Sequence, residues 1–129
     1  CVDGGGWVSS SSTLQNGTAY VHFVQPVSAT GFHATRFFEL SYFANSNLNT
    51  NTKIDVTLVY ADPNHANPVT LYTATHYAGA SNVPQLISIG TSSLLGAFNA
   101  DRGRITLKLE FYSKSNYATK IIGGAIHWI

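Results

Sequence analysis

Hydrophobic and polar residues alternate along much of the chain, and the alternation is clearest in the segments 53–60 and 104–111. Successive side chains of a β-strand point to opposite faces, so alternation predicts a strand with one buried side. In the second segment the apolar side consists of Ile105, Leu107, Leu109 and Phe111, whereas charged and hydroxyl side chains occupy the other. We therefore expect both segments to be strands of an antiparallel sheet.

Weaker patterns of the same kind predict five more strands, at 18–25, 35–43, 69–77, 85–90 and 120–129. The segments between them are rich in Asn, Gly, Pro and Ser, which favour turns. Helical spacing is missing apart from one possible turn at 91–98. With 129 residues the chain has the length of one domain. The sequence predicts an all-β fold over residues 1–129, an antiparallel, jelly-roll-like β-sandwich of about eight strands.

The composition excludes partners that are bound mainly by charge. Only 10% of the residues are charged and the net charge is +1. Nucleic acids and anionic membranes attract clustered Lys and Arg, and here the basic residues are scattered. No apolar stretch approaches the roughly 18 residues of a membrane-spanning helix. We expect neither nucleic-acid binding nor membrane insertion.

The only cysteine is Cys1, so the chain can form no internal disulfide and no Cys-based zinc site. The chain opens at this cysteine, contains no methionine, and ends in the apolar segment IIGGAIHWI. These features predict the C-terminal module of a longer protein.

In architecture and composition the chain resembles two groups of proteins. One is the β-sandwich carbohydrate-binding modules attached to polysaccharide-degrading enzymes. The other is the C-terminal head domains of phage and viral tail fibres and spikes. Either resemblance implies a recognition domain for a glycan or a host cell-surface receptor, located outside the cell or on a virion surface.

Catalytic motifs are missing, so the sequence predicts a protein that is not an enzyme. No G-x-S-x-G, H-E-x-x-H, Walker A or G-x-G-x-x-G pattern occurs. Glycoside hydrolysis needs two carboxyl groups, one of them usually desolvated. Only Glu39, within FFELSYF, lies in an apolar run, and the favoured interpretation is an acid that faces outward or pairs with Arg36.

Metal ligands are poorly spaced along the chain. The five histidines include no pair at the spacing that presents two imidazoles together on a strand or helix. The sequence predicts no cofactor, but a structural calcium ion is possible, with oxygens of Asp3, Asp62 and Asn64 as ligands.

Aromatic side chains are the candidate ligand-binding residues, because sugars stack on flat rings beside hydrogen-bonding groups. In the strand 69–77, Val69, Leu71 and Thr73 form the more apolar face, so Tyr72 and His76 are expected to point outward. Tyr77 follows them at the start of a polar loop. The full candidate set is Tyr72, His76, Tyr77, Tyr112, Tyr117 and Trp7. Alternatively these tyrosines only cover the sheet, and Trp7 and Trp128 seal the core.

Apolar residues occupy both faces of the last strand, which Gly123 and Gly124 interrupt, and one of these faces consists of Ile121, Ala125, His127 and Ile129. Phe37 and Phe38 are consecutive, and aromatic residues at successive positions of a strand are not expected all to enter one core. This surplus of apolar side chains predicts a homo-oligomer, with a trimer favoured, although a fully buried central strand explains it equally well. The expected function is a non-catalytic receptor- or carbohydrate-binding head of a fibre or spike. A carbohydrate-binding module of an enzyme and a structural assembly domain without ligand are the alternatives.

Overall fold

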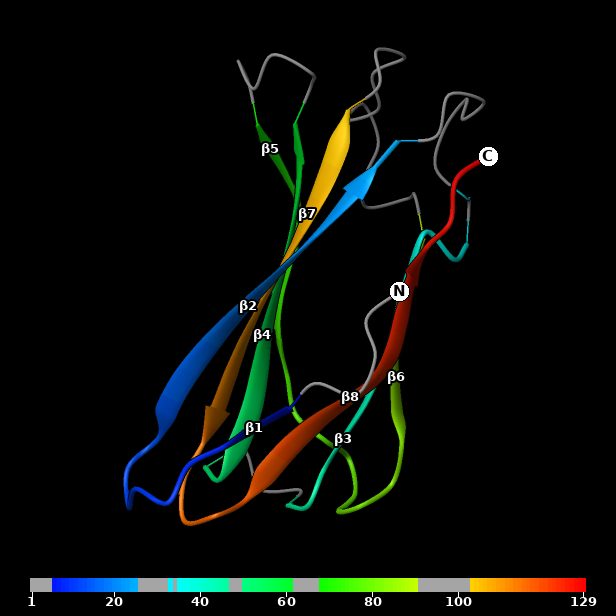
Figure 1. Ribbon diagram of the computed structural model, residues 1–129. Helices are drawn as coiled ribbons and strands as arrows, with labels where there is room; N and C mark the ends of the chain where they lie inside the picture. Colours follow the sequence, from blue (N-terminus) through cyan, green and yellow to red (C-terminus); the bar gives the residue numbers. More distant parts are fainter. Residues whose placement is uncertain (1–5, 26–32, 34, 47–49, 62–67, 91–102) are drawn as a thin grey trace.

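The computed structural model of the chain describes residues 6–25, 33, 35–46, 50–61, 68–90 and 103–129. Two four-stranded antiparallel sheets face each other (Figure 1). The strands are β1 (Gly6–Val8), β2 (Gln15–Val24), β3 (Phe38–Ala44), β4 (Thr52–Ala61), β5 (Val69–His76), β6 (Gln85–Ile89), β7 (Arg104–Ser113) and β8 (Ala118–Ile126). None of the described residues is helical.

The order of the strands is that of a jelly roll. Sheet A has the order β1-β8-β3-β6 and sheet B the order β2-β7-β4-β5. Each sheet therefore contains two of the antiparallel pairs β1·β8, β2·β7, β3·β6 and β4·β5. The predicted all-β, eight-stranded sandwich is confirmed, including the seven predicted strands, whereas β1 was not predicted because it has only three residues.

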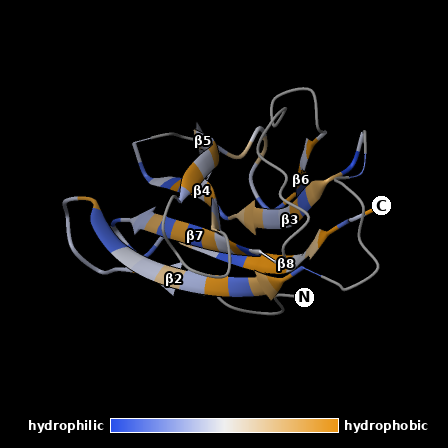
Figure 2. Ribbon diagram, turned by 90° about the horizontal axis from the view of Figure 1, so that it is seen from above, coloured by the Kyte–Doolittle hydropathy of each residue, from blue (hydrophilic) through white to orange (hydrophobic). Residues whose placement is uncertain are grey.

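The core lies between the sheets and is built by the alternation seen in the sequence. Every second residue of β4 and β7 is buried, and Figure 2 shows the alternating hydropathy along the ribbons. Burying one such aliphatic side chain contributes about 1.5–3 kcal/mol. The inward residues of β7 are those that the alternation predicted: Ile105, Leu107, Leu109 and Phe111.

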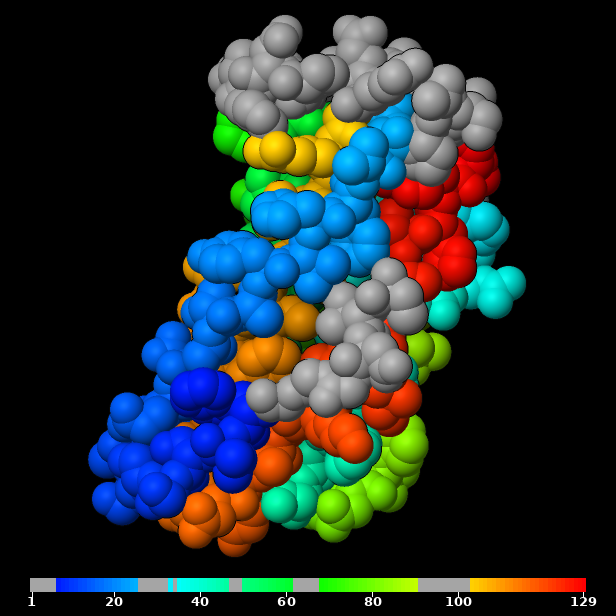
Figure 3. All heavy atoms as spheres, viewed as in Figure 1, coloured from blue at the N-terminus to red at the C-terminus, as the bar shows by residue number. Residues whose placement is uncertain are grey.

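The edge strand β2 is largely exposed on both faces, in contrast to β4 and β7. It crosses the visible face of the molecule in Figure 3, where its blue atoms run from the lower margin toward the top. Val21 and Phe23 are its half-buried residues that pack on the core. The corresponding edge strand of sheet A is β1, which has 3 residues, whereas β2 has 10.

Phe37 and Phe38 are both completely buried, so the prediction that consecutive aromatic residues cannot enter one core is wrong. Phe38 is the first residue of β3 and alternates normally. Phe37 precedes the strand, and its ring packs edge-to-face on Trp128 at 5.9 Å. This pair needs no second subunit to cover it.

A bulge divides β8, where the sequence predicted one continuous apolar face through Ile121, Ala125, His127 and Ile129. Tyr42 pairs with Ile121, but the preceding residue Ser41 pairs with Gly123, so Ile122 is the extra residue. Ile121 is consequently buried, whereas His127 and Ile129 are exposed. The predicted face does not exist as one surface, because the bulge changes the side to which alternate residues point.

The expected helical turn at 91–98 and the loop oxygens of Asp3, Asp62 and Asn64 lie outside the described residues. Within the described residues no group of three or more His, Cys, Asp or Glu side chains is close enough to hold a metal ion. The described part of the chain also has no helix that is long and apolar enough to cross a membrane.

Candidate functional site

Tyr72 and His76 point toward the core, and the prediction that they face outward is wrong. Tyr72 pairs with Leu58 and His76 pairs with Ile54, and both partners are inward residues of β4. The register shifts between Leu58 and Val59, which leaves Leu71 as the extra residue of a bulge. Leu71 is buried as predicted, but the alternation reverses beyond it.

The two side chains interact with each other at the edge of the sandwich. The Tyr72 hydroxyl lies 2.8 Å from His76 Nε2, and both side chains are half-buried. Desolvation by burial raises the pKa of Tyr72 and lowers the pKa of His76. Both groups are therefore held in their neutral forms, and the Tyr72 ring packs against the core.

The Trp7 side chain is also used in packing. It pairs with Thr119 of β8, its indole Nε1–H donates to the Gln15 carbonyl at 3.1 Å, and its ring covers Gly17 of β2. A Cβ atom at Gly17 would lie 2.5 Å from the indole ring. Trp7 thus closes the sandwich between β1 and β2. Trp128 lies beyond the opposite end of β8, so the two indole rings do not share one region.

The remaining candidates lie on other surfaces. Tyr112 is on the outer face of sheet B, where the Lys53 ammonium group is 4.4 Å from its ring centre. Desolvation raises the pKa of Tyr112, and the nearby Asp55 carboxylate adds to that effect. Tyr117 ends the turn between β7 and β8, and Tyr77 is exposed directly after β5. The six predicted residues therefore do not form one site.

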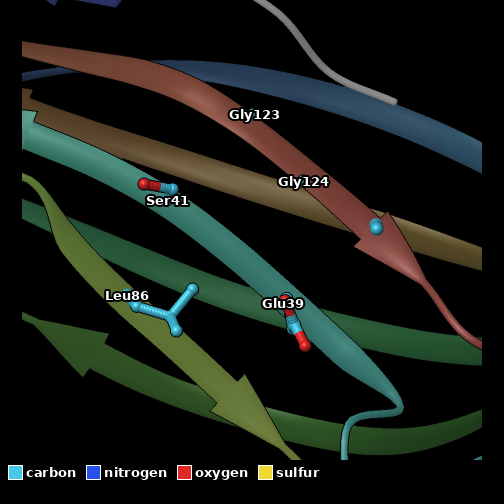
Figure 4. A pocket seen from close by; sticks show the side chains of 6 residues that line it. Glu39, Ser41, Leu86, Gly123 and Gly124 are labelled. Carbon is cyan, nitrogen blue, oxygen red and sulfur yellow. The ribbon is translucent and has the colours of Figure 1, made fainter.

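A hollow of about 240 Å³ lies on the outer face of sheet A, which the sequence reasoning did not single out as a site. One cross-strand row runs from Gly123 through Ser41 to Leu86, and the next joins Ala125 to Glu39. Figure 4 shows Glu39, Ser41 and Leu86 projecting on the side away from sheet B. The residues that line the hollow are Glu39, Ser41, Leu86, Gly123, Gly124 and Ala125.

The hollow exists because its central side chains are small. In a regular sheet every outward residue of a central strand carries a side chain that covers the backbone, and here β8 offers only Gly123 and Ala125. Gly124 has a different role. A Cβ atom there would lie 3.2 Å from the Glu39 carbonyl oxygen, so this glycine permits the close approach of β8 to β3.

A second depression of about 240 Å³ lies on the other side of Glu39 and is lined by His33, Arg36, Glu39 and His127. Glu39 lines both depressions. We call the two together the sheet A trough, and the second depression its charged end. The carboxylate Oε1 of Glu39 lies 3.9 Å from His127 Nε2, which is too long for a hydrogen bond. Each of the two groups can therefore form a hydrogen bond with a ligand hydroxyl.

His33 has a defined hydrogen-bonding role in the charged end. Its Nδ1 accepts the backbone N–H groups of Thr35 at 3.3 Å and Arg36 at 3.1 Å. A neutral imidazole that accepts at one nitrogen carries its proton on the other. Nε2 of His33 is thus an N–H donor. The ring is held in place by the backbone bond from His33 N–H to the His127 carbonyl at 3.1 Å.

An aromatic ring follows the hollow on the same face of β3. Phe43 is half-buried, points outward like Ser41, and pairs with Lys120, whose ammonium group lies 5.9 Å from the ring centre. A sugar needs a flat or apolar surface for its C–H groups and fixed polar groups for its hydroxyls. The trough combines both, with Phe43 and Leu86 beside the hollow and the charged side chains at one end.

The trough is poorly suited to hydrolysis. Glycosidases use two carboxyl groups about 5–10 Å apart. Among the described residues that line the trough, Glu39 is the only acid. The sequence offered two signals for this site, the acid in the apolar run of β3 and the Gly123-Gly124 pair that interrupts the last strand. It did not show that these segments are neighbours in one sheet.

The fold is similar to solved carbohydrate-binding modules. The structure of TmCBM61 in complex with beta-1,4-galactotriose matches with a TM-score of 0.54 and 8% identity, over 98% of this chain and 70% of that one. A second match is a structure from work on the promiscuous specificity of carbohydrate-binding modules of the β-sandwich superfamily. It has a TM-score of 0.49 and 7% identity, over 92% of this chain and 57% of that one. A third match, the structure of infectious bursal disease virus, Gx strain, has a TM-score of 0.35 and 10% identity, over 94% of this chain and 30% of that one.

At these identities the similarity concerns the fold alone, and the two matches with TM-scores of 0.49 and 0.35 carry no further argument. No protein-family model and no curated protein sequence matches the chain. The resemblance to β-sandwich carbohydrate-binding modules, predicted at the level of architecture, is confirmed as a similarity of fold.

Proposed function

We propose that the protein is a non-catalytic carbohydrate-binding module that holds a glycan in the sheet A trough. The observation that carries the proposal is the hollow at Gly123, which is bordered by the hydrogen-bonding side chains of Glu39 and Ser41 and shares Glu39 with the charged end. The fold similarity to TmCBM61, a module solved with a bound galactotriose, supports it. A module of this kind acts outside the cell, where polysaccharides are found.

The rigid sheet favours binding over a merely structural role. The hollow is built on the strands β3, β6 and β8, whose backbones are hydrogen-bonded to one another, so the backbone that carries Glu39 and Ser41 is ordered before a ligand arrives. Preorganised groups lose little conformational entropy on binding. Leu86 is among the most exposed apolar residues of the protein, and a sugar ring seated in the hollow would cover it.

The test fills the hollow and measures binding. Soluble polysaccharides, including β-1,4-galactan, are screened by affinity electrophoresis and ranked by calorimetry. Gly123→Val places a branched side chain in the hollow from β8, and Ser41→Leu fills it from β3. We expect each variant to lose at least about tenfold in affinity, or about 1.4 kcal/mol, while the melting temperature stays near that of the wild type.

Gly79→Val is the matched control, because Gly79 is exposed outside both sheets and does not line the trough. Retained binding in both trough variants, with the hollow filled and the fold intact, would show that the trough is not the site. Failure of the wild-type protein to bind any polysaccharide would argue against the proposal itself.

The alternative of a fibre or spike head differs mainly in its assembly. The buried Phe37 and Phe38 remove one reason to expect a subunit interface. We therefore propose the enzyme-associated module and expect a monomer by light scattering. A mass of three chains would instead favour the function of a fibre or spike head.

A further inference from the structure

We propose that the glycan is acidic, and that the charged end of the trough receives a carboxylate or sulfate group of the sugar seated in the hollow. This inference rests on the proposed function, because it concerns the ligand of the same site. It specifies the chemical class of sugar that the trough selects.

The first argument is the set of free donors in the charged end. Nε2–H of His33 is a donor, since its Nδ1 is occupied by two backbone N–H groups. Arg36 lines the same depression and is exposed. No carboxylate of the described residues lies within 4.0 Å of Arg36. Arg binds planar carboxylates through two parallel hydrogen bonds, and it also binds sulfate and phosphate oxygens.

The second argument is the distribution of charge on this face. The outer face of sheet A and the trough carry the cations Arg36 and Lys120 against the single described acid Glu39. His127 adds positive charge when it is protonated. A neutral sugar would leave the Arg36 charge without a counterpart in the complex, whereas an anionic substituent would use it.

The third argument is the position of Glu39 between the two depressions. Because Glu39 lines both, a group attached to a sugar ring in the hollow needs to reach only past this one side chain. An anion beside Glu39 would be repelled unless that carboxylate is neutralised. His127 Nε2 lies 3.9 Å from it and can supply the opposite charge on protonation.

The experiment compares acidic polymers with matched neutral ones by calorimetry at physiological salt. Polygalacturonate, alginate and hyaluronan test carboxylates, each beside its carboxyl-reduced form. Dextran sulfate beside dextran tests sulfate. We expect at least one acidic polymer to bind about tenfold or more tightly than its neutral partner, as one charge-assisted hydrogen bond provides. Arg36→Gln should remove most of this difference.

Arg104→Gln is the matched control, because it removes the same charge from the outer face of sheet B. It should leave the preference for the acidic polymer unchanged. A preference for dextran sulfate alone would identify sulfate as the group. If both control and trough variants weaken the binding equally, the effect is only net charge and the inference fails.

The two proposals fail in different ways. Equal binding of the acidic and neutral partners, lost in Gly123→Val, would overturn the acidic ligand and leave the carbohydrate site intact. Binding of acidic polymers that Gly123→Val and Arg36→Gln do not affect would place the site elsewhere and overturn both. Absence of binding to every polymer would also overturn both.

Discussion

Tyr72 Oη and His76 Nε2 lie 2.8 Å apart on the inner side of β5, four residues from each other along one strand. The hydrogen bond joins two polar groups at the edge of an apolar core, and each satisfies the other there. The pair therefore belongs to the packing of sheet B. It is not an open binding surface, and its consequences are measurable as stability.

The stability of the protein should fall in acid partly because of His76. Burial lowers the pKa of His76 below its ordinary value of 6.5, so the unfolded chain binds a proton that the folded protein resists. Stability from this group is complete above pH 6.5 and is lost as the pH falls below it. In His76→Gln, the decrease in melting temperature between pH 7.5 and 5.5 should be smaller than in the wild type. His22→Gln, at an exposed imidazole, is the matched control.

Truncation of Tyr72 should affect folding before it affects binding. Tyr72→Ala removes a ring that packs on the core and should lower the free energy of unfolding by about 2–4 kcal/mol. Tyr72→Phe loses only the hydrogen bond to His76 and should cost about 0.5–1.5 kcal/mol. Urea denaturation measures both. Unchanged stability of Tyr72→Ala, together with lost glycan binding, would restore Tyr72 as a ligand residue.

Gly103 should tolerate no side chain. A Cβ atom there would lie 2.3 Å from the Tyr60 ring, which is buried and donates its hydroxyl hydrogen bond to Gln25 Oε1 at 3.0 Å. The same oxygen accepts the Gly103 N–H at 2.9 Å, so the ring cannot easily move away. Gly103→Ala should cost about 1–3 kcal/mol. Gly79→Ala, whose Cβ atom would meet its nearest neighbour at 3.4 Å, should stay within about 0.5 kcal/mol.

Replacement of Thr119 by valine should stabilise the protein. Thr119 is 1% exposed, and its Oγ1 has no hydrogen-bond partner among the described residues. The similarly shaped valine removes the unpaired hydroxyl, which should raise the free energy of unfolding by about 1–2 kcal/mol. The control is Thr52→Val at another buried threonine, whose Oγ1 donates to the Ser46 carbonyl at 3.3 Å. Thr52→Val should lower the free energy of unfolding by about 1 kcal/mol. An equal decrease in Thr119→Val would contradict the expected stabilisation.

The strands could be predicted from the sequence because burial follows a period of two. This held for β4 and β7, where every inward residue matched the alternation. It failed at Leu71 and Ile122, where a single extra residue reverses which side chains point inward. A bulge depends on the pairing of two strands, and nothing in the local pattern around Tyr72 announces it.

The candidate site could be predicted only in its parts. Glu39 and the paired glycines stood out in the sequence, but β3 and β8 are separated by most of the chain. Arg36 was considered only as an ion-pair partner of Glu39, and His33 only as one of five histidines without ligand spacing. Their place in the charged end depends on a turn in which His33 Nδ1 accepts two backbone N–H groups, and no sequence pattern shows that turn. Exposed aromatic residues were a poor guide, because Trp7 and Tyr72 are used in packing.

The hollow at Gly123 results from a missing side chain in the middle of a paired strand, and every described residue that lines it belongs to β3, β6 or β8. The depth of the hollow is therefore adjustable in small steps, by one carbon atom from glycine to alanine and by two more from alanine to valine, while the backbone hydrogen bonds hold the surroundings in place. A series of variants at this single position would measure how much room each sugar substituent occupies. The largest residue at position 123 that still permits binding would then indicate the size of the ligand group that occupies the hollow.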